Sequence, residues 1–289
     1  MSRVFRYTSF VLYRFLRALQ QNRAQSRLLY LLTKFKIKSN TILFRSILEA
    51  KNVLLFIFPD VPLPVALFSL SGTNGTVDRS PNGAIKAVPN NIKFAPGPHG
   101  NPNGSFYFSG INRSHVKLRK SGQLDTRFSI GVFAWVHLDN SSGPIYTHEL
   151  PNKYYGLSLQ VSHSSLGVKV RYVDRKSLSS YLLFKKNVLQ AHSWNFIGTA
   201  YDYHTGVASI FVNNNTVVLK YIKVKMELAT YSSVRIGAMK KQKVYFRGRI
   251  SCLQVYDQAL SVDQIIKVKT RCNQTGKFAV LSKNERATH

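Results

Sequence analysis

The chain has 289 residues, enough for one large domain or two small ones. Hydrophobic residues make up 44% of it, which is enough to form a buried core. Its formal net charge is +29, with 41 basic and 12 acidic residues, and this excess indicates an anionic partner: nucleic acid, an acidic membrane or an acidic polysaccharide. The chain has only two cysteines, Cys252 and Cys272, which excludes a cysteine-rich zinc site but allows one disulfide.

Residues 1–63 are predicted to form a basic, partly helical extension and linker. Ten Lys or Arg residues precede the first acidic residue, Glu49, and the pattern favours a basic amphipathic helix. Such openings resemble organelle transit peptides or membrane-surface helices, and an extension unrelated to the main domain is the alternative. The apolar run 53–70 contains Asp60 and three prolines, so we interpret it as a linker followed by a strand, with a degraded membrane anchor as the alternative.

Beyond this extension, short runs rich in β-branched and aromatic residues predict strands, which are separated by turn clusters at 73–83 and 94–105. No alternation of strands with helices is visible, so the pattern favours a mostly antiparallel sandwich or barrel. The expected strands span 65–70, 105–110, 115–119, 128–138, 143–150, 155–162, 167–174, 181–186, 194–202, 206–213, 216–225, 233–239 and 249–257.

The stretch 194–219 predicts a meander of three strands. Gly206 is free to adopt positive φ in the first turn, and three consecutive asparagines at 213–215 suit the second. After the last strand, Ser261 and Gln264 form a capping box that predicts a helix over 259–269.

Five phrases in this order carry a family resemblance: "ALFSLSGTNGTVDRSPNG", "PNGSFYFSGINRSHVKL", "LDTRFSIGVFAWVHLDNSSGPIY", "SWNFIGTAYDYHTGVASIFVNN" and "FRGRISCLQVYDQALSVDQI". They resemble the laminin G-like, concanavalin A-like jelly-roll family. The resemblance covers about residues 65–272 and implies an all-β antiparallel sandwich in a protein that is usually extracellular and usually binds rather than catalyses. We place the sandwich domain at 64–275 and a C-terminal tail at 276–289. One departure is Asn213-Asn214, where the family's hairpin usually has Asp-Gly.

Catalytic and metal signals are weak. Glycoside hydrolysis requires two carboxylates flanking the bond, but no predicted strand carries two acids on one face, so we expect no enzyme activity. The histidines are scattered, and His99, His192 and His204 fall in turns, where solvated loop roles are expected. Calcium, the one cofactor considered, needs six to eight oxygen ligands. The candidate ligands are Asp78, Asn82 and Asp257.

Basic residues provide the strongest binding signal. Several recur at a spacing of two, which places them on one face of a strand, and flat positive strips suit sulfated or carboxylated polymers. An ordinary solvated sheet face is the alternative. The candidate glycan-binding residues are Lys117, Arg119, Lys169, Arg171, Lys223, Lys225, Lys240, Lys241, Lys243, Arg247 and Arg249.

Six Asn-x-Ser/Thr acceptors for N-glycosylation favour secretion: Asn74, Asn103, Asn112, Asn140, Asn214 and Asn273. A disulfide between Cys252 and Cys272 agrees with this compartment, because a strand, a turn and about two helical turns bring the chain back beside its own strand. Two buried free thiols in an intracellular protein are the alternative.

These observations predict a non-catalytic extracellular module that binds acidic glycans or matrix proteins. One alternative is a membrane-associated or organelle-targeted protein that acts through its N-terminal helix, and another, disfavoured, is a polysaccharide hydrolase. We expect no nucleic-acid binding, because the aromatic runs "FYF" and "VYF" suit a core better than a stacking platform.

Overall fold

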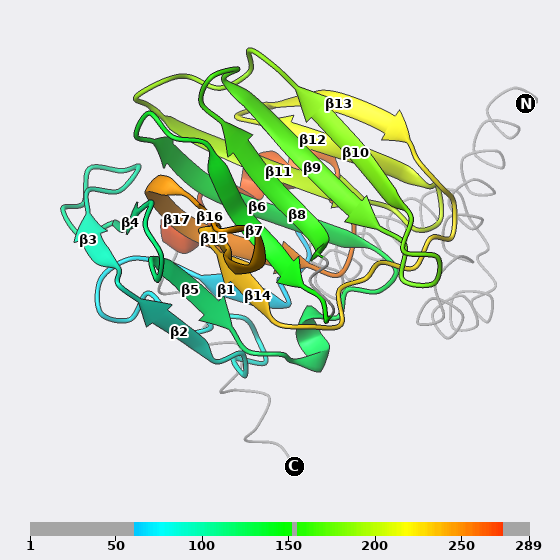
Figure 1. Ribbon diagram of the computed structural model, residues 1–289, viewed down its shortest axis with the longest axis horizontal. Coiled ribbons are helices and arrows are strands. Elements are labelled where there is room, and N and C mark those ends of the chain that lie inside the picture. Colours follow the sequence, from blue (N-terminus) through cyan, green and yellow to red (C-terminus); the bar gives the residue numbers. More distant parts are fainter. Residues whose placement is uncertain (1–60, 152–154, 274–289) are drawn as a thin grey trace, which may run out of the picture. The chain divides into compact units, whose positions relative to one another are not determined.

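The structure, a computed structural model, describes residues 61–151 and 155–273. These residues form an antiparallel β-sandwich, as the sequence predicted (Figure 1). The predictions for most of the basic extension and for the tail lie outside the described residues, and the boundaries of the sandwich domain stay a prediction. None of the helices in the described part of the chain is long and apolar enough to cross a membrane.

The first sheet has eight strands, all paired antiparallel. Its order is β13 (Asn215–Tyr221), β12 (Val207–Val212), β11 (Trp194–Tyr201), β6 (Ile130–Leu138), β17 (Arg247–Tyr256), β4 (Ser105–Ser109) and β3 (Lys93–Ala95), with β1 (Ala66–Phe68) also paired to β17.

The second sheet has seven antiparallel strands and lies toward the viewer in Figure 1. Its order is β10 (Ser180–Lys185), β9 (Gly167–Val173), β8 (Tyr155–Ser162), β7 (Gly143–Glu149), β14 (Val234–Ile236), β5 (His115–Leu118) and β2 (Ala87–Asn90). Shorter elements are β15 (Ala238–Met239), β16 (Val244–Tyr245), η1 (Gly122–Leu124), η2 (Lys240–Gln242), α4 (Val262–Val268) and η3 (Arg271–Asn273).

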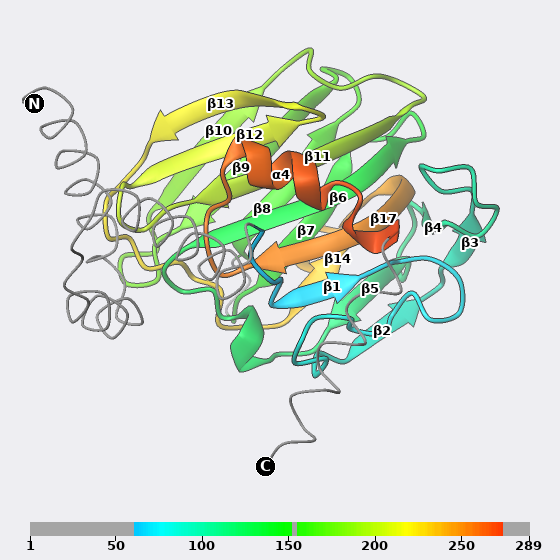
Figure 2. The ribbon, with the colours of Figure 1, turned by 180° about the vertical axis from the view of Figure 1, so that it is seen from behind.

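The main core lies between the two sheets, and a second, smaller core lies outside the eight-stranded sheet. Strand β6 serves both, because alternate residues of a strand point to opposite faces. Val132 and Val136 point into the main core, whereas Phe133 and Trp135 join Ile265 of α4 in the second. Figure 2 shows α4 on this outer face. The near-continuous apolar run of β6 therefore reflects burial on both sides.

The predicted meander is present as β11, β12 and β13. Gly206 has φ +71°, and an added Cβ would lie 2.5 Å from the Val224 nitrogen, so the turn requires glycine. Asn213 has φ +57°, and its side-chain oxygen accepts a hydrogen bond from the Phe196 N–H at 3.0 Å. This side-chain bond explains how asparagine replaces the usual glycine turn.

Two predicted strands are wrong in part. The run 216–225 ends as a strand at Tyr221, because Ile222 bonds back to Gly206 and Lys225 has φ +54°, which breaks the extended conformation. The run 233–239 is interrupted at Gly237, where φ is +80°. The ring of Phe108 fills the space that a Cβ would occupy there, so the chain turns from β14 into β15.

The C-terminal helix has the predicted capping box. Ser261 Oγ accepts from the Gln264 N–H, and Gln264 Oε1 accepts from the Ser261 N–H. The helix is shorter than predicted, running from Val262 to Val268, and η3 follows it.

Candidate binding site

A cleft of about 400 Å³ opens on the outer face of the eight-stranded sheet. We call it the Trp135 cleft. Its walls come from the loop that follows β1, the loop before β4, the outer faces of β6 and β17, and the segment that follows α4. The lining residues are Ser69, Ser71, Arg79, Gly97, Pro98, His99, Asn101, Gly104, Trp135, Ser251, Cys252, Lys269 and Cys272.

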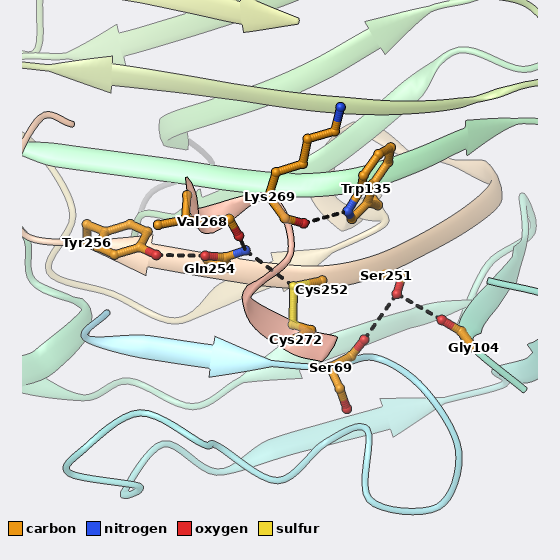
Figure 3. The surroundings of a disulfide bond; sticks show 10 residues. All are labelled: Ser69, Gly104, Trp135, Ser251, Cys252, Gln254, Tyr256, Val268, Lys269 and Cys272. Atoms are coloured by element: carbon orange, nitrogen blue, oxygen red, sulfur yellow. Dashed lines mark hydrogen bonds between the residues drawn. A yellow bond between two sulfur atoms is a disulfide. The ribbon is translucent and has the colours of Figure 1, made fainter. Parts of the chain in front are cut away.

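A disulfide forms part of the lining, and Figure 3 shows its surroundings. The sulfurs of Cys252 on β17 and Cys272 in η3 are 2.05 Å apart, which confirms the predicted pairing. The bond joins the segment after α4 to the sheet, so Lys269 and Cys272 form a fixed wall of the cleft.

Trp135 is held by contacts with two neighbours, Lys269 and His99. Its Nε1 donates a hydrogen bond to the Lys269 carbonyl at 3.0 Å, and the Lys269 ammonium lies 5.0 Å from the centre of the ring (Figure 3). His99 packs edge-on, with ring centres 5.8 Å apart. The indole is 9% exposed, so it offers the cleft a fixed edge rather than a freely moving platform.

Gln254 of β17 fixes the C-terminal end of α4 to the sheet. Its Nε2 donates to the Val268 carbonyl at 2.9 Å, and its Oε1 accepts from the Tyr256 hydroxyl at 2.6 Å (Figure 3). Burial raises the pKa of Tyr256, so this hydroxyl keeps its proton and remains a donor at physiological pH. The position of Lys269, the next residue after Val268, is therefore set by a buried network.

Ser251 joins the loop walls to the sheet. Its hydroxyl lies 2.8 Å from the Gly104 carbonyl and 3.3 Å from the Ser69 carbonyl, so β17 contacts both loops (Figure 3). Gly97 packs directly on Gly104: an added Cβ at Gly97 would lie 2.5 Å from the Gly104 carbonyl oxygen. Only glycine permits this close approach, which brings His99 to the rim.

The electrostatics of the cleft favour an anion. Arg79 and Lys269 contribute cations, His99 contributes an imidazole, and none of the described lining residues is Asp or Glu. Serine hydroxyls and the Asn101 side chain add hydrogen-bonding groups. The arrangement can hold a hydroxylated ligand with a negative charge, but it lacks the carboxylate pair that glycoside hydrolysis requires.

The basic residues predicted from sequence do not form one site. On the seven-stranded sheet, Lys169 and Arg171 share the outer face of β9, beside the exposed Phe184 and Leu182 of β10. Lys117 lies across the same sheet on β5, whereas Arg247 and Arg249 belong to β17 of the other sheet.

Three further placements differ from the predicted strips. Lys223 and Lys225 are not on one strand face, because β13 ends before them, and the Lys223 ammonium lies 2.7 Å from an Asp174 carboxylate oxygen. Arg119 lies beyond the end of β5.

The remaining predicted cations, Lys240, Lys241 and Lys243, lie in the hairpin closed by η2, where the Lys241 ammonium donates to the Leu150 carbonyl at 2.6 Å.

Of the three predicted calcium ligands, Asp78 stabilises a turn and the other two are exposed. The Asp78 carboxylate accepts hydrogen bonds from the backbone N–H groups of Leu67, Ser80 and Ile85 at 3.0–3.2 Å, which is turn chemistry. Asn82 and Asp257 are exposed. Among the described residues no group of three or more His, Cys, Asp or Glu is placed to hold a metal ion.

Five glycosylation acceptors, Asn74, Asn103, Asn112, Asn140 and Asn214, are exposed, and each lies in a turn or bend. Their placement is compatible with modification, and their occupancy stays a prediction. Asn273 lies in η3.

Sequence reasoning missed most of the cleft. Arg79, Lys269 and the serines gave no signal, because they come from segments far apart in the chain, and His99 was interpreted as a solvated loop residue. Trp135 and Cys252 were the visible clues. In the "FYF" and "VYF" runs, Phe106, Phe108 and Phe246 are buried in the core.

Comparisons with known proteins agree with the fold. A family model described as the concanavalin A-like lectin/glucanases superfamily matches residues 110–266. A search of curated proteins finds no match.

Similar solved structures include binding domains of botulinum neurotoxins. The serotype G domain has 13% identity and a TM-score of 0.58, and the match covers 73% of this chain and 52% of that one. The serotype D ligand-binding domain in complex with N-acetylneuraminic acid has 14% identity and a TM-score of 0.55, with 71% and 50% covered. This chain therefore spans about half the length of those domains, and identity this low establishes the fold alone.

Proposed function

The chain belongs to the concanavalin A-like lectin/glucanases superfamily, and from this premise we propose that it is a non-catalytic module that binds an acidic glycan in the Trp135 cleft. The observation that carries the proposal is the lining itself: two cations, an indole edge and several hydroxyl groups, with no carboxylate among the described lining residues.

The non-catalytic assignment rests on where the acids are. Asp125 pairs with Arg175, Glu149 with Arg235, and Glu227 with both Arg127 and Lys176. Each of these carboxylates is already engaged by a cation, and none of them lines the cleft. Without an acid and a base across a sugar bond, the cleft can bind a glycan but cannot hydrolyse it by the usual mechanism.

A ligand that carries a carboxylate or sulfate fits the charge. N-acetylneuraminic acid, the sugar in the serotype D complex, carries a carboxylate, and that complex supports the class of ligand without assigning it to this chain. An extracellular location is part of the proposal. It is supported by the disulfide and by the five exposed acceptor asparagines. Acidic segments of matrix proteins are the related partner class.

The test is direct titration of the full chain with sialylated, sulfated and neutral oligosaccharides over a salt series. We expect the acidic ligands to bind and their affinity to fall as salt rises. Lys269→Gln and Arg79→Gln should each weaken binding about tenfold, which corresponds to about 1.4 kcal/mol.

The matched control is Arg171→Gln, which removes an exposed cation from the other sheet and should change affinity less than twofold. Equal binding of neutral and acidic sugars would refute the charge assignment. Equal loss in all three variants, or equal retention on DNA, would indicate general attraction of polyanions to a basic protein.

A further inference from the structure

Asn214 lies at the tip of the hairpin between β12 and β13, close to the Trp135 cleft. Its side chain is exposed, and its Oδ1 accepts a hydrogen bond from the Lys269 ammonium at 3.1 Å. Thr216, two residues later, is also exposed and completes an Asn-x-Thr acceptor for N-glycosylation. Strand β13 is an edge strand of its sheet, so the hairpin tip is open to an enzyme.

Lys269 connects this acceptor to the cleft. The same ammonium lies 5.0 Å from the centre of the Trp135 ring, and Lys269 lines the cleft. The two polar atoms of the Asn214 amide are bonded to one carbon. A sugar attached to Nδ2 therefore begins within a few bond lengths of the cation proposed to hold the ligand's negative charge.

We propose that N-glycosylation of Asn214 regulates the Trp135 cleft by shielding Lys269; this inference rests on the proposed function. In the modification, the Nδ2–C1 bond forms, and the C1–oxygen bond of a lipid-pyrophosphate-linked oligosaccharide breaks. One Nδ2 proton leaves with the lipid pyrophosphate. The attached glycan lies over the rim, its hydroxyls solvate the ammonium, and acidic ligands bind more weakly.

Two other exposed acceptors near the cleft, Asn74 and Asn103, have no such side-chain contact with a lining residue in the described part of the chain. Asn103 and Asn74 lie in neighbouring turns, and the Gly72 N–H donates to the Asn103 carbonyl at 2.9 Å. That contact involves the backbone, whereas at Asn214 the modified amide itself touches a lining residue. Asn140, in the turn after β6, provides a control for N-glycosylation as such.

The experiment uses the full chain, secreted from a eukaryotic line with a heterologous signal peptide. Mass spectrometry of the peptide that contains Asn214 measures occupancy. Thr216→Ala abolishes glycosylation and leaves the Asn214–Lys269 hydrogen bond in place, and Asn140→Gln removes a remote glycan. We expect occupied Asn214 in the wild type, at least threefold tighter binding of a sialylated oligosaccharide by Thr216→Ala, and unchanged binding by Asn140→Gln.

A second measurement separates this inference from the function. The rate at which an amine-reactive reagent modifies Lys269, read by peptide mapping, should be higher in Thr216→Ala than in the glycosylated wild type. Unoccupied Asn214, or equal Lys269 reactivity in the two forms, overturns the inference and leaves glycan binding standing. Faster Lys269 modification in a protein that binds no acidic sugar in any form supports the shielding and refutes the proposed function.

Discussion

The two outer faces of the sandwich are built from opposite kinds of residue. The outer face of the eight-stranded sheet carries Phe133, Phe196 and Phe211 beneath α4. The outer face of the seven-stranded sheet carries Gln160 of β8, which pairs with Lys169 of β9, and Arg171 lies on the same face of β9. The pair Lys169 and Arg171 lies on the second face, yet the cleft opens on the first, where loops and the segment after α4 form its walls. The position of this exposed pair of cations therefore does not locate the cleft.

The largest expected effect is on the apolar face. Phe133 is fully buried against Phe196 and Tyr256, with ring centres 6.1 Å apart in both cases. Phe133→Ala should lower the free energy of unfolding by about 3–5 kcal/mol, measured by urea denaturation. Arg171→Ala on the other face should change it by less than about 0.5 kcal/mol. Similar values for the two variants would mean that α4 does not cover a true second core.

The disulfide should matter nearly as much. Replacing both Cys252 and Cys272 with Ala should cost about 3 kcal/mol, because the bond closes a loop with a separation of 20 residues. It should also weaken acidic-glycan binding, since the wall that carries Lys269 loses its attachment. Calorimetry and titration check the two effects. Unchanged binding in a destabilised variant would show that the hydrogen bonds from Gln254 and Trp135 suffice to hold the wall in place.

Acidification should destabilise the protein mainly through His148, which lies on β7 of the seven-stranded sheet. Burial lowers the pKa of His148 to about 4, from an ordinary value of 6.5. Below pH 6.5, His148 becomes protonated in the unfolded chain, whereas in the folded chain it stays neutral until about pH 4. The free energy of unfolding therefore falls as the pH drops from 6.5 to about 4. The slope for one such proton is about 1.4 kcal/mol per pH unit.

His148→Gln should reduce the measured slope by the contribution of this one proton, determined by urea denaturation at pH 4.5, 5.5 and 6.5. His192→Gln, an exposed residue in the loop before β11, is the control and should keep the wild-type slope. His115 should keep its own contribution, because burial and then the Arg235 charge lower its pKa to about 4 as well. A slope left unchanged by His148→Gln would contradict the role of His148.

The smallest effect is expected from the basic face itself. Reversing Lys169 and Arg171 to Glu should lower the salt concentration that elutes the protein from heparin, because the overall field weakens. The affinity of a short acidic sugar for the cleft should change less than about twofold, since exposed charges more than about 10 Å away are largely screened. A larger loss would move the binding site to the seven-stranded sheet.

Local features were predictable from the sequence. The alternation in 194–219, the Ser261–Gln264 capping box and the Cys252–Cys272 bond all depend on residues near one another in the chain. The fates of individual lysines were not. Lys223 and Lys269 look alike in sequence. Lys223 pairs with Asp174, which is 49 residues away in the chain. Lys269 instead lies over Trp135, which is 134 residues away and donates a hydrogen bond to the Lys269 carbonyl. Only the fold decides which cation is neutralised.

The position of Trp135 makes the protein its own optical probe. The chain has two tryptophans, and the other, Trp194, packs edge-on against His137 with ring centres 5.5 Å apart. Trp135 shares the cleft lining with the disulfide and His99, and both disulfides and protonated imidazoles quench indole emission. In a Trp194→Phe variant, the emission that remains among the described residues comes from the cleft. Ligand entry and disulfide reduction should therefore each be readable as a change in brightness, without a label.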